Sequence, residues 1–417
     1  MPHSAVVRSD RDTTKVRLVF DASSKGNGCK SRNECLNPGP PLNPSILDVI
    51  LRFREYEYAF SCDIQGAFLT IGIAEKDRDY LRFFWFPDES DSKTYKILRM
   101  TRVPFGVTSS PFILAATIKY HIRKYKLEQS ETCEMLDSAL YVDDLFYGAN
   151  TIEKTLELSQ SALRNLWSER GLSDVTETKE RPLKVLGIIW NTEEDTFKLD
   201  VKPLLDMICD RKNSKRSVLQ TASKLFDLMG IASPFIVLIK LLMQEIWELD
   251  LGWDDELSTD LKKKWDNWCC QIYLLKDLTI ERKYFSIPWK LVKELELLHI
   301  FSDASPKAFG AVAYFRYVSS DDCIYTSFIT AKSRIAPLKR LTLRRLELMG
   351  AVISSRLFQH LKANFKFPVP RVYMWTDSLI ALHWIKGKAS KWKPFVSNRV
   401  SETQSRTDPA DWNHCSG

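Results

Sequence analysis

Two adjacent aspartates, Asp143 and Asp144, lie in the middle of an apolar and aromatic run that extends from residue 138 to residue 147. Such a run favours a β-strand, where neighbouring carboxylates repel each other and burial penalises both charges. A tight hairpin with a divalent metal ion at its tip removes both costs, because the cation turns the repulsion into coordination. The run therefore predicts a hairpin that presents two acids to a metal ion.

A third acid has a similar setting. Asp63 follows a β-prone run at 58–62 and precedes a helix-like stretch at 65–69. Taken alone, an aspartate at the end of a strand is more often a helix cap than a metal ligand. Together with Asp143 and Asp144 it completes a set of three carboxylates, which suits phosphoryl transfer at two metal ions about 3.5 to 4 Å apart.

A second set of acids lies in the last third of the chain. Asp303 ends a predicted strand, and Asp377 follows another at 372–376. Glu347 lies within a helix predicted from 342 to 362. Acids at two strand ends and on one helix can converge on a face of a sheet. Because Glu347 borders a mostly apolar side of its helix, its carboxylate needs a metal or cationic partner.

Three regions of the chain differ in pattern. Residues 1–200 mix short strands with helices, which predicts an α+β sheet domain. Residues 201–292 are helical and rich in Leu and Trp, a composition that favours packing over a ligand site. Residues 293–417 follow a βββαβα order, which fits a mixed sheet with helices packed on it. The predicted fold class is therefore multidomain, combining α+β and α/β regions.

The net charge of +7 is concentrated at one end of the chain. It is close to zero over 1–150, −3 over 151–300 and +10 over 301–417. The basic end suits a polyanionic partner, and a merely solvated basic face explains the excess equally well.

The chain shows no secretion or membrane signal. Its N-terminus has no basic segment followed by an apolar one, and its longest apolar stretch, 228–239, contains Pro234 and is too short to span a bilayer. Nine cysteines without CxxC spacing indicate reduced thiols. We expect an intracellular protein, cytoplasmic or nuclear, with no membrane partner.

Several motifs in order along the chain resemble a known family. The palm motifs of retroelement reverse transcriptases are similar to the segments 62–68, 103–111 and 141–144. More narrowly, the BEL/Pao class of LTR retrotransposon polyproteins resembles the segments 16–23, 47–54 and 224–234. The resemblance implies a right-hand polymerase with fingers and palm in the first region, a thumb or connection-like second region, and a ribonuclease H-like third region.

Carried over position by position, the resemblance assigns roles to the first set of acids. Asp63, Asp143 and Asp144 would hold two Mg²⁺ ions, for which Mn²⁺ could substitute, and the backbone carbonyl of Ile64 would be a further ligand. Carboxylates and carbonyls suit such a hard cation. The segment 184–199 looks like the hairpin that positions the primer end.

The same resemblance implies contacts with the incoming nucleotide. Arg17 would grip the triphosphate, since its fork of donors suits phosphate, although it is otherwise an ordinary surface arginine on a strand. Phe68 would lie under the sugar and reject a 2′-hydroxyl; without the family it would be a core residue. Phe105 and Gly106 would begin a loop near the nucleotide and template.

The second set of acids, Asp303, Glu347 and Asp377, is similar to that of ribonuclease H domains, which implies two-metal hydrolysis of RNA in a hybrid. His414 would be the mobile histidine near the metals. The fourth acid of such domains is expected beyond Gly417 and not at Asp411. We therefore expect a ribonuclease H-like region that is truncated at its C-terminus, and fingers that are short at the N-terminus.

The predicted function is that of an RNA-directed DNA polymerase, with a ribonuclease H-like domain of doubtful activity. Its partners would be an RNA or DNA template-primer, an RNA–DNA hybrid and deoxynucleoside triphosphates. The alternative is an inactive retroelement remnant that only binds nucleic acid through its basic end. Candidate backbone contacts there are Lys386, Lys388, Lys391 and Lys393.

Overall fold

The computed structural model describes residues 1–7, 16–64, 66–86, 94–127, 130–167, 183–209, 211–287, 291–367, 369 and 371–417. The chain divides into two compact units. The first comprises Met1–Ser45 and Tyr58–Asp174, and the second comprises Ile46–Glu57 and Val175–Gly417. The second unit thus includes a short segment, 46–57, that interrupts the first unit in the sequence. The domain boundaries predicted at residues 200 and 292 come from sequence patterns, whereas the two units are defined by contacts. These boundaries therefore stay a prediction.

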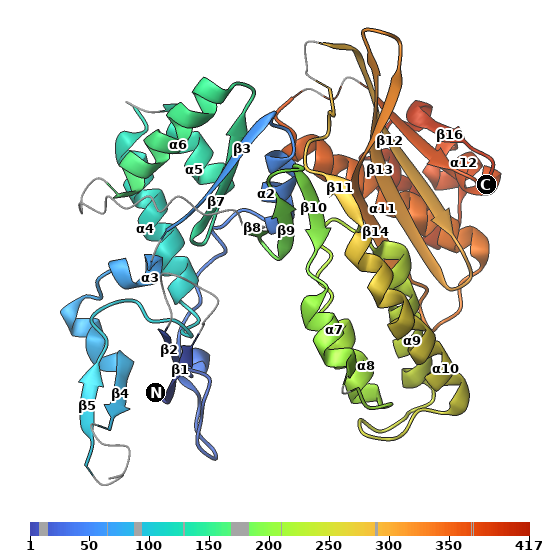
Figure 1. The fold of residues 1–417 in the computed structure, drawn as a ribbon. Helices are drawn as coiled ribbons and strands as arrows, with labels where there is room; N and C mark the ends of the chain where they lie inside the picture. The colour runs from blue at the N-terminus through green and yellow to red at the C-terminus, as the bar shows by residue number, and fades with distance from the viewer. Residues whose placement is uncertain are drawn as a thin grey trace. The chain divides into compact units, whose positions relative to one another are not determined.

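The first unit is built around a three-stranded antiparallel sheet in the order β3-β7-β6, with α5 and α6 packed on it (Figure 1). Two hairpins, β1-β2 and β4-β5, form separate two-stranded sheets. The elements are β1 (His3–Val7), β2 (Val16–Phe20), α1 (Arg32–Cys35), β3 (Tyr58–Asp63), α3 (Ala67–Thr70), the 3₁₀ helix η1 (Glu75–Leu81), β4 (Arg82–Trp85), β5 (Lys96–Arg99), α4 (Ser110–Tyr125), α5 (Ser130–Ala139), β6 (Leu140–Tyr141), β7 (Asp144–Ala149) and α6 (Ile152–Trp167).

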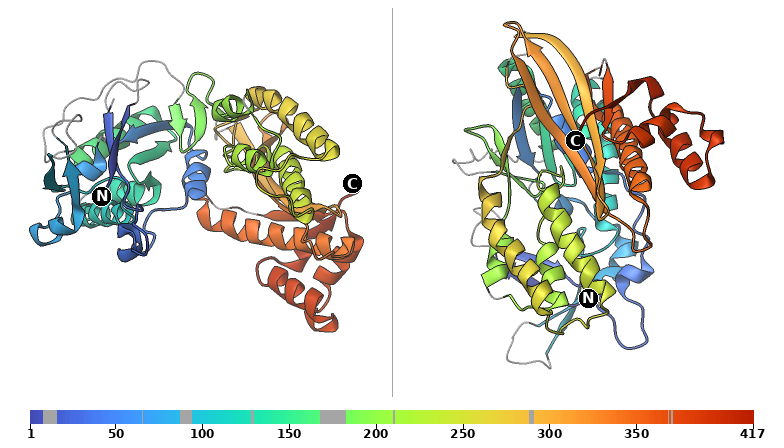
Figure 2. Two further views of the ribbon diagram at one scale, coloured as in Figure 1. Left: turned by 90° about the horizontal axis from the view of Figure 1, so that it is seen from below. Right: turned by 90° about the vertical axis from the view of Figure 1, so that its right-hand side faces the viewer.

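The second unit begins with α2 and continues with a four-stranded antiparallel sheet in the order β11-β10-β9-β8. Helices α7 to α10 follow, and α9 and α10 lie side by side (Figure 2). Trp265 and Trp268 are buried in the core of these helices, which is the packing role predicted for this region. The elements are α2 (Ile46–Phe53), β8 (Leu183–Val185), β9 (Ile188–Asn191), β10 (Thr196–Leu199), α7 (Lys202–Cys209), α8 (Lys215–Ala222), α9 (Ser233–Glu248), α10 (Thr259–Gln271), the 3₁₀ helix η2 (Ile272–Asp277) and β11 (Thr279–Glu281).

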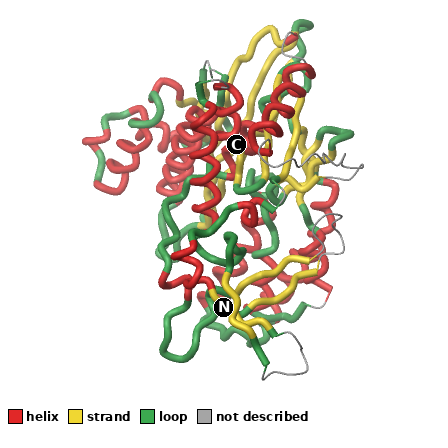
Figure 3. Tube along the Cα trace, turned by 90° about the vertical axis from the view of Figure 1, so that its left-hand side faces the viewer, coloured by secondary structure: helices red, strands yellow, loops and turns green. Residues whose placement is uncertain are grey.

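A five-stranded sheet in the order β14-β13-β12-β15-β16 completes the second unit, with its long strands visible in Figure 3. The pairs β12–β15 and β15–β16 are parallel and the others antiparallel. The predicted βββαβα order is confirmed, and helix α13 and strand β16 follow it. The elements are β12 (Val292–Ala304), β13 (Ala308–Ser319), β14 (Ile324–Ile335), α11 (Leu343–Asn364), β15 (Val372–Thr376), α12 (Leu379–Lys386), the 3₁₀ helix η4 (Ala389–Lys391), α13 (Pro394–Gln404), the 3₁₀ helix η5 (Pro409–Asp411) and β16 (Trp412–His414).

Across the described ranges, no helix has the length and apolar character needed to cross a membrane.

A tight loop links the helical part of the second unit to the five-stranded sheet. The Asp227 carboxylate accepts hydrogen bonds from the backbone N–H groups of the three residues 230–232, at 2.8 to 2.9 Å. The carbonyl of Met229 accepts the Ala331 N–H at 2.8 Å and the Thr330 hydroxyl at 2.7 Å. Gly230 has a φ of +81°, and a Cβ there would lie 2.2 Å from the carbonyl oxygen of Ala331. Only glycine therefore fits this loop.

We expect Gly230→Ala to lower the free energy of unfolding of the second unit by about 2 kcal/mol or more, because it adds left-handed strain to a backbone clash. Urea unfolding followed by tryptophan fluorescence measures this. Gly26→Ala is the control, since a Cβ at Gly26 meets no atom within 4 Å. Equal midpoints for the two variants would contradict the expectation.

Glu55 predicts a pH dependence of stability. It is buried at the end of α2, where its carboxylate accepts the Lys366 backbone N–H at 3.1 Å. Burial raises the pKa of Glu55 to about 8, against the opposing effects of that hydrogen bond and of the charges on Lys366 and Arg52. The folded chain therefore holds this proton up to about pH 8, whereas the unfolded chain releases it near the ordinary value for Glu.

Stability should consequently fall as the pH rises from about 5 through 8. We expect the free energy of unfolding to be roughly 2 kcal/mol lower at pH 8 than at pH 6, and Glu55→Gln to remove most of that difference. Denaturant unfolding at several pH values measures it, with the exposed Glu248→Gln as control. A Glu55→Gln profile parallel to that of the unmodified chain would be evidence against this assignment.

Candidate active sites

The first site lies at one end of the β3-β7-β6 sheet. In the antiparallel pairing of β3 with β7, Asp63 is directly opposite Asp144. The backbone N–H of Ile64 donates to the carbonyl of Asp143 at 2.8 Å, which continues the pairing beyond the strands. The turn between β6 and β7 contains Val142 with a φ of +59°, an uncommon conformation for a β-branched residue. The predicted hairpin is confirmed, and its tip brings Asp143 and Asp144 beside Asp63.

The sheet behind this tip is closely packed. β7 is buried from Leu145 onward, while Asp143 and Asp144 are half-buried and Asp63 is exposed. Burial raises the pKa of the neighbouring Cys62 thiol to about 11, so it stays protonated beside the acids. The apolar strands thus end where the carboxylates begin, at an edge open to solvent.

The donor set at this edge fits a hard divalent cation in its chemistry, since it consists of carboxylates and backbone carbonyls. Residues opposite each other in an antiparallel pair lie about 4.5 to 5.5 Å apart at Cα, close enough to share ligands. Within the described ranges, no three His, Cys, Asp or Glu side chains are gathered tightly enough to hold a metal ion. The acids are therefore adjacent in the backbone, and their side chains are not drawn together as ligands.

Three of the four predicted nucleotide-contact residues lie near one another. Phe68 is buried in an apolar cluster, and its ring centroid lies 4.8 Å from that of Phe105 at an angle of 65°. Gly106 has a φ of +91°, and a Cβ there would lie 2.0 Å from the carbonyl oxygen of Phe20, so only glycine permits this approach to β2. The Arg17 side chain lies outside the described part of the chain.

Sequence reasoning missed Asn33, which holds the loop after Phe105. Its amide nitrogen donates to the Gly106 carbonyl at 3.1 Å and to the Ser23 hydroxyl at 2.9 Å. Its amide oxygen accepts the Thr108 N–H at 2.9 Å. A single asparagine in a polar segment gives no local signal of its contacts with Gly106 and Thr108, which lie more than 70 residues away in the sequence.

The second site lies at the end of two parallel strands. Ser302 of β12 pairs with Thr376 of β15, so Asp303 and Asp377 follow at the same sheet edge. Helix α11 approaches this edge at Gly350, where a Cβ would lie 3.2 Å from the Asp303 carbonyl oxygen. Glu347, about one helical turn before Gly350, accepts a hydrogen bond from the Ser378 hydroxyl.

His414 and Cys415 reach the same edge through β16, in which His414 pairs with Thr376. His414 Nε2 lies 3.1 Å from the Asp377 carbonyl oxygen. Burial raises the pKa of the Cys415 thiol, and the charges of Asp377 and Asp303 raise it further, so both carboxylates act on one thiol. Asp411 directly precedes β16, and its exclusion from the ligand set stays a prediction. Cys415 itself was not predicted.

The surroundings of this edge are polar and partly basic. Asp303 and Asp377 are exposed, and Glu347 is half-buried. A cavity of about 610 Å³ lies beside Asp303 and extends toward Pro234 in α9. The lysines predicted to contact a nucleic-acid backbone, Lys386, Lys388, Lys391 and Lys393, are all exposed along the end of α12, η4 and the start of α13.

Comparisons with solved structures show the fold. A foamy viral protease-reverse transcriptase in complex with double-stranded DNA matches with a TM-score of 0.60 and 15% identity, over 99% of this chain and 64% of that one. The structure of such a protein with an RNA/DNA hybrid matches with a TM-score of 0.59 and 14% identity, over 100% and 50%. The chain thus spans between half and two thirds of the length of these two proteins.

Comparisons of sequence identify the family. No curated protein matches the chain. Residues 28–188 match the family described as reverse transcriptase (RNA-dependent DNA polymerase), and residues 214–378 match the family described as Pao retrotransposon-like RNaseH-like domain. These two matches confirm the resemblance read from the motifs, in the same order along the chain. The chain therefore contains a reverse transcriptase domain followed by a Pao retrotransposon RNaseH-like domain, and it belongs to the reverse transcriptase–RNaseH region of the BEL/Pao retrotransposons.

Proposed function

We propose that the chain is an RNA-directed DNA polymerase that extends a primer 3′-hydroxyl at Asp63, Asp143 and Asp144. The observation that carries this proposal is the pairing of β3 with β7, in which Asp63 is opposite Asp144 and the Ile64 N–H bonds to the Asp143 carbonyl. The three carboxylates would hold two Mg²⁺ ions, with the Ile64 carbonyl as a further ligand. Such ions, when bound, stabilise charge on the attacking and leaving oxygens.

The chain's own residues would shape the space next to these acids. The rings of Phe68 and Phe105, which meet edge to face, would form an apolar wall that suits a deoxyribose and disfavours an added hydroxyl with no hydrogen-bond partner there. The loop at Gly106, held by Asn33, fixes Phe105 in place. Arg17 would bind the triphosphate.

We propose a second activity at Asp303, Glu347, Asp377 and His414, the hydrolysis of RNA in an RNA–DNA hybrid. The parallel pairing of β12 with β15 and the approach of α11 at Gly350 support it, because they bring acids from three elements to one sheet edge. The Ser378 hydroxyl orients the Glu347 carboxylate. His414, which is exposed and lies within hydrogen-bonding distance of the Asp377 carbonyl, would exchange protons there.

The proposed substrates are consistent with what the related structures contain, which is double-stranded DNA in one and an RNA/DNA hybrid in another. A second function, nucleic-acid binding without catalysis, is favoured by the exposed lysines near α12 and by the charge of +10 over 301–417. Lysines of this kind would contribute salt-dependent, sequence-independent affinity.

Primer extension tests these proposals. The purified chain is incubated with an RNA template, an annealed DNA primer, four deoxynucleotides and Mg²⁺, and a labelled hybrid reports cleavage of the RNA strand. We expect extended DNA that disappears when EDTA is added. Salt-dependent binding of the hybrid with neither extension nor cleavage would reject catalysis and leave the binding function.

A further inference from the structure

We propose that Arg282 is a positioning residue for the polymerase site, because it fixes the chain at the entrance to β3 and thereby the strand that ends at Asp63. The inference rests on the proposed polymerase function of Asp63. Arg282 follows β11, far in the sequence from that site. Its contacts are confined to the second unit, which includes residues 46–57, and β3 begins with the next residue, Tyr58.

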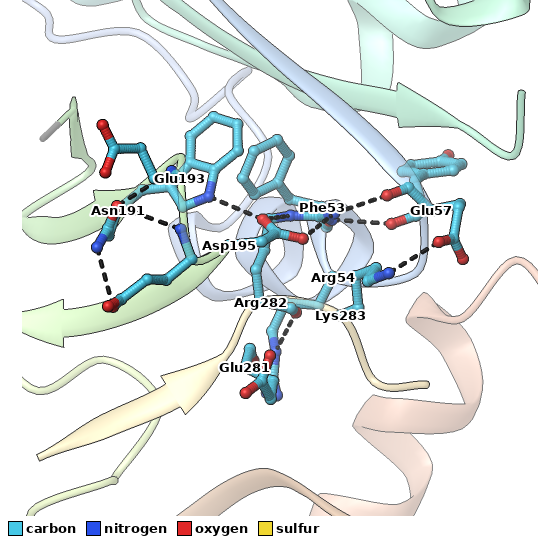
Figure 4. Close-up of polar contacts among 12 residues, drawn as sticks. Phe53, Arg54, Glu57, Asn191, Glu193, Asp195, Glu281, Arg282 and Lys283 are labelled. Atoms are coloured by element: carbon cyan, nitrogen blue, oxygen red, sulfur yellow. Dashed lines mark hydrogen bonds and ion pairs between the residues drawn. The ribbon is translucent and has the colours of Figure 1, made fainter. Parts of the chain in front are cut away.

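All three nitrogens of the Arg282 guanidinium group donate hydrogen bonds (Figure 4). Its side chain is 1% exposed, and Nε and Nη2 donate to the two carboxylate oxygens of Asp195 at 2.6 and 2.8 Å. Nη1 donates to the carbonyls of Phe53 and Tyr56, both at 2.9 Å, and Nη2 donates to the carbonyl of Glu57 at 3.0 Å. These five hydrogen bonds match the five N–H donors of arginine.

The neighbouring residues reinforce the same segment. The Arg54 Nε donates to the Arg282 carbonyl at 2.9 Å, and the Tyr284 N–H donates to the Arg54 carbonyl at 3.1 Å. The Lys283 ammonium lies 2.8 Å from the Glu57 carboxylate (Figure 4). Residues 53–57 are therefore held on both sides by the three residues 282–284.

The chemistry explains why an arginine is required. The guanidinium donates to three carbonyls at the end of α2 and in the turn after it, those of Phe53, Tyr56 and Glu57. The Asp195 carboxylate neutralises the buried charge and fixes the plane of the guanidinium through two parallel hydrogen bonds. A lysine brings three donors from a single nitrogen, so it cannot hold Asp195 and all three carbonyls.

Strand β3 links the residues that Arg282 holds to Asp63, the proposed polymerase acid. β3 runs without interruption from Tyr58 to Asp63 and is paired along its whole length with β7. An extended strand is stiff, so a shift of the carbonyls at 56 and 57 passes to its first residues and strains the pairing. Misplacement by about 1 Å at a reacting group can lower a rate about a hundredfold.

Arg282→Lys in the full chain tests the inference, with Arg216→Lys as the matched control. Arg216 also binds a carboxylate through two hydrogen bonds, to Asp254, but it is half-exposed and contacts no part of 53–57. We expect Arg282→Lys to accelerate hydrogen exchange at the amides of Tyr58–Cys62 at least tenfold and leave exchange in β12 and β13 unchanged. The kcat of primer extension should fall about tenfold or more, with the KM for deoxynucleotides and the Kd for the hybrid within about twofold. Arg216→Lys should change none of these.

Unchanged exchange at 58–62 and unchanged kcat in folded Arg282→Lys would overturn the inference. So would equal losses of kcat, hybrid binding and β12 protection, since these indicate general unfolding. If the unmodified chain does not extend primers, the proposed function fails by itself. The exchange measurement then still decides whether Arg282 holds the entrance to β3.

Discussion

Replacing Asp144 by Asn should reduce the rate of primer extension by about a thousandfold or more. Asparagine keeps the size of the side chain but removes a negative charge and one strong acceptor from the strand position opposite Asp63. A site that stabilises transferring phosphoryl oxygens through bound cations depends on those charges for several kcal/mol, and each 1.4 kcal/mol corresponds to a tenfold change in rate. Single-turnover extension with saturating Mg²⁺ measures the loss.

The matched control is Asp137→Asn, which removes an exposed aspartate of α5 in the same unit. Asp137 forms a surface ion pair with Lys119, so its loss should change stability by less than about 1 kcal/mol and leave extension unaffected. Both variants should bind the template-primer with a Kd within about threefold of the unmodified chain at fixed salt. Full extension by Asp144→Asn, or equal loss in Asp137→Asn, would exclude the assigned role.

The parts of the fold that could be predicted from sequence are those with a local signal. The strand predicted at 372–376 has these bounds in the structure, and Thr342 is the N-cap of α11. Ser378 caps α12 through its hydroxyl, and Thr151 accepts the Lys154 N–H at 3.2 Å, as a helix cap does. Each of these features depends on a few neighbouring residues, whose hydrogen bonds and apolar spacing appear directly in the sequence.

The acids of the candidate site could be predicted from the sequence, but the residues that hold its backbone could not. Adjacent carboxylates within an apolar run are costly anywhere except at a metal, so Asp143 and Asp144 stand out. Asn33 and Arg282 act through backbone carbonyls far away in the sequence, and any segment offers carbonyls, so no residue pattern marks the contact. The placement of 46–57 in the second unit was missed for the same reason. In the structure Arg54 lies 3.9 Å from the Met229 sulfur, a contact that neither sequence segment indicates.

Replacing Arg54 by Met should lower the free energy of unfolding of the second unit by about 3 to 5 kcal/mol. Arg54 is 1% exposed and donates to the carbonyls of Glu281, Arg282 and Ile329 at 2.9 to 3.1 Å, and its guanidinium stacks 4.3 Å from the Tyr284 ring centroid. Burial lowers the pKa of Arg54, which shows the cost of the charge, and the nearby Tyr284 offsets part of it. Methionine removes that cost but takes the Arg54 donors away from these three carbonyls, of which those of Arg282 and Ile329 are buried, at about 1 to 3 kcal/mol for each buried carbonyl.

The orphaned carbonyls should decide the outcome, because they lie in two separate segments, residues 281–282 and residue 329, and a methionine side chain has no donor for either. Of the twelve tryptophans only Trp85 and Trp167 lie in the first unit, so fluorescence during urea unfolding reports mainly on the second. Arg216→Met, which breaks an exposed ion pair with Asp254 and a contact with the Trp253 ring, should leave the urea midpoint nearly unchanged. A destabilisation by Arg54→Met no larger than that of Arg216→Met would mean that the buried charge costs as much as its hydrogen bonds contribute, and that α2 is held in the second unit by apolar packing alone.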